Sequence, residues 1–348
     1  MKFGTFHLFQ KPPGWSDDDV FRAELEQIES AEEMGFDGVW LAEHHFQWYG
    51  IAPDLMVIAG WVAARTSRIR IGTAIVVLPF HNPLRLAEQV ATVDLMSGGR
   101  LDLGVGRGYQ AAEYDAFGVS MDESKARFAE CMDVLLKAWT EETFSHDGAY
   151  YSFHDVTLLP KPVQQPHPPV YVASWMTPET IRYAAQRGFP IMAPAGLASD
   201  QIKTNYQLYR ETLDTLGKTE DGLDLPALVH IYVDDDDRRA WETGAEYSNR
   251  YGASLVTLGS PVQKGGRLSK DYSAYREFGE SGRVVKENRQ ELLLFGNPDT
   301  VARRIEWMRD ELGVNYIMCW MNMGGLDRER VLRSMRLFAD EVMPRFRA

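Results

Sequence analysis

Two adjacent histidines, His44 and His45, are the side chains of this sequence best suited to acid–base chemistry. They follow the β-type run 38–42, and successive side chains along extended backbone point in opposite directions, so at most one of them can face a common site. A histidine exchanges a proton near neutral pH because its unperturbed pKa is ~6.5. We expect His44 to have the functional role and His45 to be held by a nearby carboxylate such as Glu43.

A second group of residues could bind an anion. Arg107 stands in the run Gly104-Val105-Gly106-Arg107-Gly108 and is followed by Tyr109. Glycines expose the backbone, and a guanidinium can hold a phosphate through two parallel hydrogen bonds. The run lacks the Gly-x-Gly-x-x-Gly spacing of dinucleotide-binding folds, so it indicates a phosphate site only weakly. A tight turn with a surface arginine is the alternative.

Hydroxyl groups mark a third candidate, at the start of a predicted helix. Ser174, Thr177 and Thr180 surround this start, with Thr177 as the cap and Pro178 in the first turn. The N-terminus of a helix binds phosphate well, and hydroxyls add donors. However, Pro178 lacks an N–H and Glu179 already places a negative charge there, so simple capping is an alternative.

Two further patterns have a functional and a structural explanation. The small residues Gly72, Thr73 and Ala74 leave room for a flat group against the backbone, although ordinary barrel packing explains them as well. His81 could join the histidine pair around a metal, but the sequence has no His-x-His or His-x-x-x-His pair and only two, widely separated, cysteines. We therefore predict no metal site.

The elements that position these residues alternate between β-type runs and amphipathic helical patterns. Helical patterns cover 17–34, 54–65, 82–96 and 124–139, and eight β-type runs are counted, at 2–8, 38–42, 70–77, 101–105, 170–173, 190–193, 228–233 and 316–321. This alternation predicts an α/β fold, a (β/α)₈ TIM barrel with insertions. The candidate residues then gather at the carboxyl ends of the strands.

We predict one domain, 1–348, because eight βα units use the whole chain. A proline-rich stretch with paired aromatics at about 143–169 predicts a hairpin insertion. The stretch at about 250–290, rich in Gly, Ser and Lys, shows no clear periodicity, and we predict a lid-like insertion there.

Composition excludes several classes of function. The 348 residues include 45% apolar ones, enough for a large core, and 37 Lys and Arg against 50 Asp and Glu give a net charge of −13. An acidic surface repels nucleic acids and anionic membranes. The amino terminus has no apolar signal block, and no run reaches the ~20 residues of a membrane span. We expect a soluble, cytoplasmic protein.

Four motifs in this order resemble those of the bacterial luciferase-like flavin monooxygenases. They are Leu41-Ala42-Glu43-His44-His45-Phe46, Gly72-Thr73-Ala74-Ile75 with Leu78-Pro79, Gly104-Val105-Gly106-Arg107-Gly108, and Gly296-Asn297-Pro298-Asp299-Thr300-Val301. The resemblance spans nearly the whole chain. It implies a TIM barrel, usually dimeric, that takes reduced FMN as a diffusible co-substrate.

The resemblance also implies residue roles. His44 matches the catalytic histidine, Arg107 a phosphate ligand, and Thr177 and Thr180 the hydroxyl-bearing helix start. The family's non-proline cis peptide would be Ala74–Ile75, behind the flavin ring. The predicted cofactor-binding residues are Ala74, Ile75, Arg107, Tyr109, Ser174, Thr177 and Thr180. Luciferase has a reactive cysteine where this chain has Gly106, so we predict no light emission.

The implied reaction is oxygenation of a small apolar substrate by reduced FMN and O₂ through a flavin hydroperoxide, with His44 as acid and base and a separate NAD(P)H-dependent flavin reductase as partner. Aromatic residues near the expected site suggest an apolar or aromatic substrate; they are Trp48, Tyr49, Tyr109, Trp175 and Trp320. Three alternatives are hydride transfer with a deazaflavin on the same barrel, a non-catalytic flavin-binding protein, and a metal-dependent barrel hydrolase.

Overall fold

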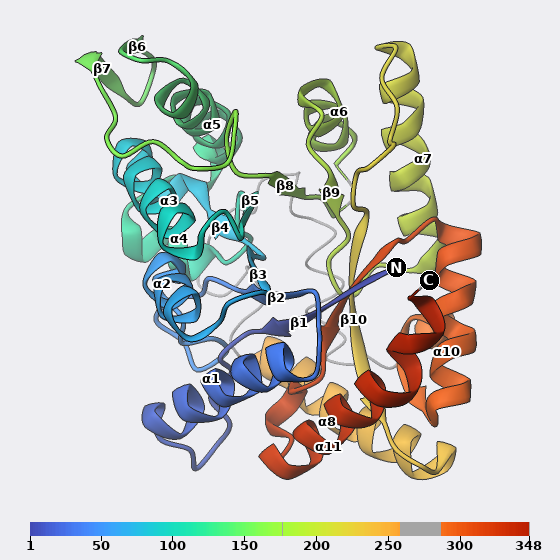
Figure 1. The fold of residues 1–348 in the computed structure, drawn as a ribbon. Helices are drawn as coiled ribbons and strands as arrows, with labels where there is room; N and C mark the ends of the chain where they lie inside the picture. The colour runs from blue at the N-terminus through green and yellow to red at the C-terminus, as the bar shows by residue number, and fades with distance from the viewer. Residues whose placement is uncertain (176, 258–286, 348) are drawn as a thin grey trace.

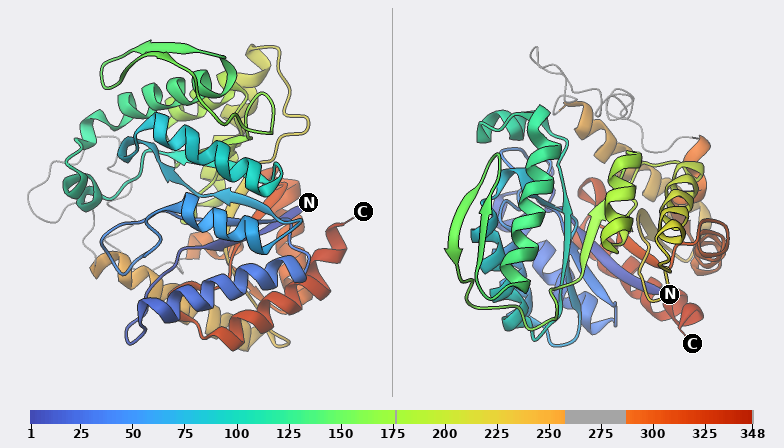
Figure 2. Two further views of the ribbon diagram at one scale, coloured as in Figure 1. Left: turned by 60° about the vertical axis from the view of Figure 1, so that its left-hand side comes forward. Right: turned by 90° about the horizontal axis from the view of Figure 1, so that it is seen from above.

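The chain folds into a parallel β-barrel surrounded by helices (Figures 1 and 2). The computed structural model describes residues 1–175, 177–257 and 287–347. The barrel strands are β1 (Lys2–His7), β2 (Gly38–Leu41), β3 (Arg70–Thr73), β4 (Val76–Val77), β5 (Leu101–Gly106), β8 (Val170–Ala173), β9 (Ile191–Met192), β10 (Pro226–Val233) and β12 (Tyr316–Trp320). Neighbouring strands are parallel, and a bridge between Ala193 and Ala227 joins the β9 side to β10. The predicted TIM barrel is confirmed.

Two strands differ from prediction. The expected strand 70–77 is divided into β3 and β4, and the Ala74–Ile75 peptide bond between them is cis, as the resemblance implies. An additional short strand, β11 (Leu294–Gly296), pairs with the C-terminal half of β10. A three-residue buried run is too short to show a periodicity, which is why the sequence did not reveal it.

The helices lie outside the strands (Figure 2). They are α1 (Asp17–Glu33), α2 (Leu55–Arg65), α3 (Pro83–Ser97), α4 (Ala111–Phe117), α5 (Ser124–Thr140), α6 (Pro178–Arg187), α7 (Ser199–Thr215), α8 (Asp237–Thr257), α10 (Pro298–Trp307) and α11 (Arg328–Leu337). Short 3₁₀ turns occupy Leu78–Phe80, Met121–Glu123, Glu287–Leu292, Met323–Gly325 and Met343–Phe346, and π-helical turns Met308–Leu312 and Phe338–Val342. Among the described residues, no helix is long and apolar enough to cross a membrane.

Local signals explain where the predicted helices begin and end. The Asn82 side chain accepts hydrogen bonds from the first turn of α3, and Pro83 begins this helix. Gly98 ends α3 in the left-handed conformation, with φ +65°. Ser16 and Asp19 form a capping box at the start of α1.

The two expected insertions have different outcomes. An antiparallel hairpin, β6 (Phe144–Asp147) and β7 (Ser152–Val156), lies beyond α5, whose Glu130 carboxylate accepts hydrogen bonds from three backbone N–H groups of the hairpin turn, at 149–151. Of the lid-like insertion expected at about 250–290, residues 250–257 belong to α8 and residues 287–290 to a 3₁₀ turn. Residues 258–286 lie outside the described residues, so the lid stays a prediction.

Side chains fill the barrel interior near its N-terminal end. The Trp40 ring lies against Gly72, where a Cβ would come within 2.3 Å of the ring. The indole Nε1 donates to the Tyr316 hydroxyl at 3.0 Å. Gly72 is therefore small because Trp40 needs the space, so the packing explanation holds for this position.

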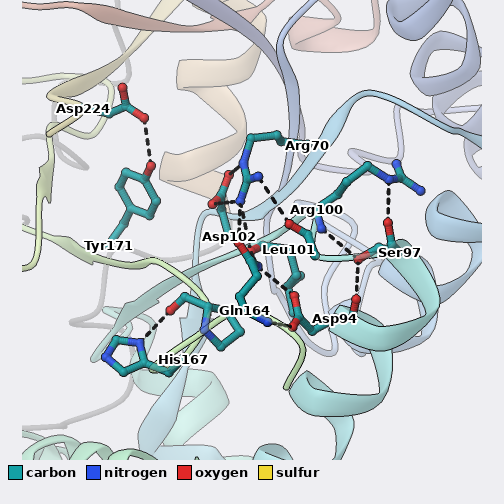
Figure 3. A network of polar contacts seen from close by, with 12 residues as sticks. Arg70, Asp94, Ser97, Arg100, Leu101, Asp102, Gln164, His167, Tyr171 and Asp224 are labelled. Carbon is teal, nitrogen blue, oxygen red and sulfur yellow. Dashed lines mark hydrogen bonds and ion pairs between the residues drawn. The ribbon is translucent and has the colours of Figure 1, made fainter. Parts of the chain in front are cut away.

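A polar network closes the same end of the barrel (Figure 3). The Arg70 guanidinium at the start of β3 holds the buried Asp102 carboxylate of β5, with Nε to Oδ2 at 2.7 Å. Gln164 donates to Asp94 and to a carbonyl of β5. The Tyr171 hydroxyl donates to Asp224 at 2.9 Å. These groups tie the strand starts to one another.

Candidate active site

A cavity lies at the C-terminal ends of the barrel strands. Every predicted site residue lines it; these residues are His44, Ala74, Ile75, Arg107, Tyr109, Ser174, Thr177 and Thr180. They follow β2, β3, β5 and β8, whose carboxyl ends meet because the strands are parallel. The structure thus brings together residues that are up to 136 positions apart in the sequence, from 44 to 180.

His44 is oriented by a carboxylate that the sequence did not reveal. Its Nδ1 lies 2.9 Å from Glu113 Oε1, and the backbone N–H of His45 donates to the same oxygen at 2.9 Å. Glu113 is only 2% exposed. One buried carboxylate therefore fixes both the imidazole ring and the loop that carries it.

Glu113 was missed because its helix was missed. It lies in α4, a seven-residue helix that follows the glycine-rich loop directly. Helices this short have too few turns to show an apolar stripe. The one available signal was its place: α4 follows the C-terminal end of β5, where barrel sites gather.

His45 and His81 are held by Glu43, which confirms the prediction for His45. The His45 Nε2 lies 2.9 Å from Glu43 Oε1, and His81 Nε2 lies 3.1 Å from both carboxylate oxygens. Burial opposes ionisation of Glu43, but these two histidines and the Val77 N–H lower its pKa to about 2. Burial disfavours the charged form of His81 and so lowers its pKa, but the Glu43 carboxylate raises the pKa by more, and the net shift is upward. Among the described residues, no cluster of His, Cys, Asp and Glu is arranged for a metal.

The end of the cavity near β8 has hydroxyl groups that the described residues do not engage as partners or as a helix cap. The Ser174 hydroxyl is buried, and it has no hydrogen-bond partner among the described residues. Thr177 occupies the N-cap position of α6 but makes no side-chain capping hydrogen bond. The explanation of this motif as simple capping therefore fails. Buried polar atoms without partners are rare, and they point to a missing ligand or water.

A small recess continues this end of the cavity. Arg107 and Thr180 line both spaces, and Lys125 of α5 and Tyr183 of α6 line the recess. The Tyr183 hydroxyl is also buried without a hydrogen-bond partner in the described chain. Two cationic side chains and several hydroxyls thus surround this end of the cavity, together with the exposed carboxylate of Glu179, and cations with hydroxyl donors are the groups that bind phosphate.

The glycines next to Arg107 have a packing function. A Cβ on Gly104 would lie 1.9 Å from the Thr73 carbonyl oxygen, and one on Gly106 would lie 2.2 Å from Ile75 Cδ1. These contacts bring β5 close to the segment that contains the cis peptide bond. A cysteine at position 106 would collide with Ile75, so the cavity has no room for a thiol there as it is built.

The remaining wall combines apolar side chains with three tyrosines. The Tyr49 hydroxyl lies 2.9 Å from that of Tyr109 and 2.7 Å from that of Tyr251. Burial is the main cause that raises the pKa of all three hydroxyls, so they are neutral. Apolar and sulfur-containing side chains complete this wall; they include Phe6, Leu8, Leu228, Met318 and Trp320.

Comparison with known proteins decides the family. A model of the luciferase-like monooxygenase family matches residues 1–316. The chain belongs to this family. The alkanal monooxygenase alpha chain of Photorhabdus luminescens is 31% identical over 354 residues, covering 99% of this chain and 96% of that protein. The oxygenase component of the flavin-dependent trigonelline monooxygenase of Acinetobacter baylyi is 27% identical, covering 99% and 96%.

Solved structures of other proteins share this fold. The monooxygenase RslO1 of Streptomyces bottropensis superposes with a TM-score of 0.87 at 31% identity, and all of both chains is covered. An FMN complex of 3,6-diketocamphane monooxygenase from Pseudomonas putida gives a TM-score of 0.78 at 21% identity, covering 99% and 98%. An F420-dependent secondary alcohol dehydrogenase gives 0.77 at 23%, covering 100% and 99%. Since both cofactors occur on this fold, the choice between them depends on the site.

Proposed function

We propose that this luciferase-like protein is the oxygenase component of a two-component monooxygenase. It takes reduced FMN from a separate NAD(P)H-dependent flavin reductase and uses O₂ to oxygenate a small apolar organic substrate. The observation that carries the proposal is the unpartnered, buried Ser174 hydroxyl, which lines the same cavity as Arg107 and the His44–Glu113 pair.

The residues present fit FMN. Its phosphate would be held by the guanidinium of Arg107, the hydroxyls of Ser174, Thr177 and Thr180, and the N-terminus of α6, which supplies a positive dipole end. Ala74, Ile75 and Tyr109 line the part of the cavity that would take the ring system. Bound reduced FMN supplies the electrons that activate O₂.

His44 is the residue placed to move a proton. Because the Glu113 carboxylate accepts a hydrogen bond from Nδ1, the neutral imidazole carries its proton there and keeps a lone pair on Nε2. His44 can then accept or donate a proton at Nε2, while Glu113 fixes the tautomer and the ring plane. Glu113 is thus a positioning residue.

The cavity wall also excludes water. Phe6, Leu8, Met318 and Trp320 are all buried, and each presents an apolar surface to the cavity. A dry site strengthens electrostatic interactions and limits the loss of activated oxygen as peroxide. This feature supports oxygenation over a storage role, which needs no dry pocket beside a histidine.

We further propose that the protein forms a homodimer in the cytoplasm. Apolar side chains are exposed on α2 and α3, which pack together: Val57 is 68% exposed and Met96 57%. Such patches commonly mark interfaces. Both cysteines, Cys131 and Cys319, are free and buried, which suits a reducing compartment.

The test is a titration of reduced FMN into the full-length protein without oxygen, followed by admission of air. We expect saturable binding and then a long-lived absorption spectrum that differs from those of reduced and oxidised FMN. Immediate reoxidation, at the rate of free FMN, would contradict oxygenation and favour storage. Failure to bind reduced FMN together with tight binding of a reduced deazaflavin would favour hydride transfer.

A further inference from the structure

We propose that the substrate is a hydroxyarene, an aromatic ring with a phenolic hydroxyl, and that this hydroxyl extends the row formed by the hydroxyls of Tyr49, Tyr109 and Tyr251. The inference rests on the proposed function, since it names the substrate class of the same cavity. It assigns the row, hereafter the tyrosine row, a role in substrate selection.

The tyrosine row is assembled from three distant parts of the chain. Tyr49 comes from the loop after β2, Tyr109 from the loop after β5, and Tyr251 from α8. Tyr49 occupies the middle, with hydroxyl oxygens at 2.9 Å from Tyr109 and 2.7 Å from Tyr251. Tyr49 and Tyr251 are 3% and 5% exposed and Tyr109 is partly exposed, so two of the three rings are shielded from bulk water.

The row adjoins the proton-transfer residue. The ring centroid of His44 lies 4.7 Å from that of Tyr49 and 5.9 Å from that of Tyr109, both edge-to-face. A polar atom bound at the row therefore sits close to the imidazole. Selection of the substrate and transfer of its proton would take place side by side.

Packing behind the row holds it in place. The Tyr251 ring contacts Trp320 with centroids 4.4 Å apart and His230 at 5.6 Å. His230 hydrogen-bonds Ser248 at 2.8 Å, and burial lowers its pKa to about 3, so it is neutral. Fixed aromatic surroundings reduce the entropy lost when a ligand binds, and a row held in this way can discriminate between ligands.

Phenolic hydroxyls are not required to pack the wall of the cavity at these positions. Burying a hydroxyl costs free energy that its hydrogen bonds only offset, and phenylalanine would fill the same wall without that cost. Each hydroxyl can donate one hydrogen bond and accept two, so the bonds within the row and the bond between Tyr109 and the Gln110 side chain still leave acceptor capacity in the row. The row is therefore better suited to a polar ligand than to a plain alkyl chain.

A hydroxyl suits the row better than other oxygen groups. The hydrogen bonds along a row of hydroxyls can point in either direction, because each hydroxyl can be donor or acceptor. An added hydroxyl can therefore donate to the row or accept from it. An aldehyde or ketone oxygen only accepts. The nearby cavity surfaces of Phe6, Trp175 and Trp320 present aromatic groups, which pack well against a further ring. Together, the row and these rings favour a hydroxyarene.

The experiment compares matched pairs of ligands on the full-length protein, with and without saturating FMN, by calorimetry. The pairs are phenol and toluene, 2-naphthol and 2-methylnaphthalene, and 2-hydroxyanthracene and 2-methylanthracene, with decanal as the aliphatic probe. For at least one pair we expect the hydroxyl member to bind at least about tenfold more tightly. Tyr49→Phe should reduce that ratio below about threefold.

A matched control separates this effect from a general cost of losing a buried hydroxyl. Tyr209 is buried away from the cavity lining, and its hydroxyl donates to the Phe189 carbonyl at 3.0 Å. Tyr209→Phe should keep the full ratio. If Tyr49→Phe does not fold, Tyr251→Phe takes its place, with the same expected loss.

Several results would overturn the inference: equal binding within every pair, a ratio that persists in the row variants, or decanal binding more tightly than every hydroxyarene. None of these measurements needs reduced FMN or O₂. Equal binding of the paired ligands would therefore contradict only the substrate class, and the reduced-FMN titration would still test the proposed function. Conversely, a negative reduced-FMN titration would not change the measured binding ratios.

Discussion

The two ends of the barrel differ in whether their buried polar groups have hydrogen-bond partners. At the N-terminal end, Arg70 holds Asp102, Gln164 bonds Asp94, and Tyr171 bonds Asp224, so these side chains satisfy one another (Figure 3). At the C-terminal end, the described chain leaves buried polar atoms without partners. They are Gln47 Oε1, Ser174 Oγ, Tyr183 Oη and Asn322 Oδ1.

The position of these atoms is informative. Gln47, Ser174 and Asn322 lie in segments that follow β2, β8 and β12, and none belongs to the network at the other end. The barrel thus has a closed polar network at its strand starts and an incomplete one at its strand ends, and β8 contributes to both through Tyr171 and Ser174. A structural network is complete in the protein alone, whereas a binding site is completed by its ligand.

The largest effect on stability should come from the N-terminal network. Asp102 is 2% exposed; burial raises its pKa, and Arg70 opposes that shift. Asp102→Ala leaves Arg70 without its buried partner and should lower the free energy of unfolding by roughly 3 kcal/mol. Chemical denaturation measures this loss. The FMN dissociation constant should change less than about twofold, and a large change there would contradict a purely structural role.

At the C-terminal end, His44→Ala should lower product formation at least ~100-fold while FMN affinity stays near normal. The measurement is product formed per FMN reoxidised in single turnovers with the best-bound hydroxyarene. His45→Gln is the matched control, since His45 bonds Glu43 instead of Glu113 through its side chain. The control should lose less than about tenfold. An unimpaired His44→Ala would refute the acid–base role.

The phosphate end can be tested without turnover. Arg107→Ala should raise the FMN dissociation constant roughly 30-fold, and Ser174→Ala roughly fivefold, because each loses a charge-assisted hydrogen bond to phosphate. Riboflavin lacks the phosphate, so its affinity should be unchanged in both variants. Equal losses for FMN and riboflavin would show that these residues hold the cavity shape and not the phosphate.

Substitution of Glu43 should have a smaller effect, one on stability that depends on pH, unlike substitution of the phosphate-binding residues. Its pKa of about 2 in the folded protein lies below the ordinary 4.5, so its stabilising contribution is complete above pH 4.5 and is lost as the pH falls toward 2. Glu43→Gln should lower the free energy of unfolding near neutral pH by about 2 kcal/mol, since a pKa lowered from 4.5 to about 2 corresponds to at most roughly 3 kcal/mol. The difference from the unmodified protein should shrink between pH 5 and pH 3 in denaturation curves. A constant difference would contradict this assignment.

The fold could be predicted from the sequence because its signal is repeated. Helix caps such as Asn82 and Gly98, together with eight β-type runs, specify a barrel even when single boundaries shift. The lining of the cavity could be predicted in part, since His44, Arg107 and Ser174 each follow a strand, while their roles stay predictions. Glu113 and Tyr251 could not be predicted, because their roles depend on which helix face meets a loop far away in the sequence.

The glycines are a second case in which the sequence does not reveal a contact. A small residue in the sequence indicates that another group approaches it closely, but it does not identify that group. Gly72 accommodates the Trp40 ring and Gly106 accommodates Ile75, so neither leaves the space for a cofactor that its size suggests. Only the packed structure separates these contacts from the unfilled hydrogen-bonding positions near Ser174.

The central claim is that one FMN molecule spans the cavity from Arg107 to His44. The most direct test is a crystal structure of the FMN complex. The account predicts the phosphate within hydrogen-bonding distance of Ser174 Oγ and the Arg107 guanidinium, with the ring against Ala74–Ile75 and beside His44. A phosphate bound elsewhere, or a ring on a side of the barrel away from His44, would contradict it.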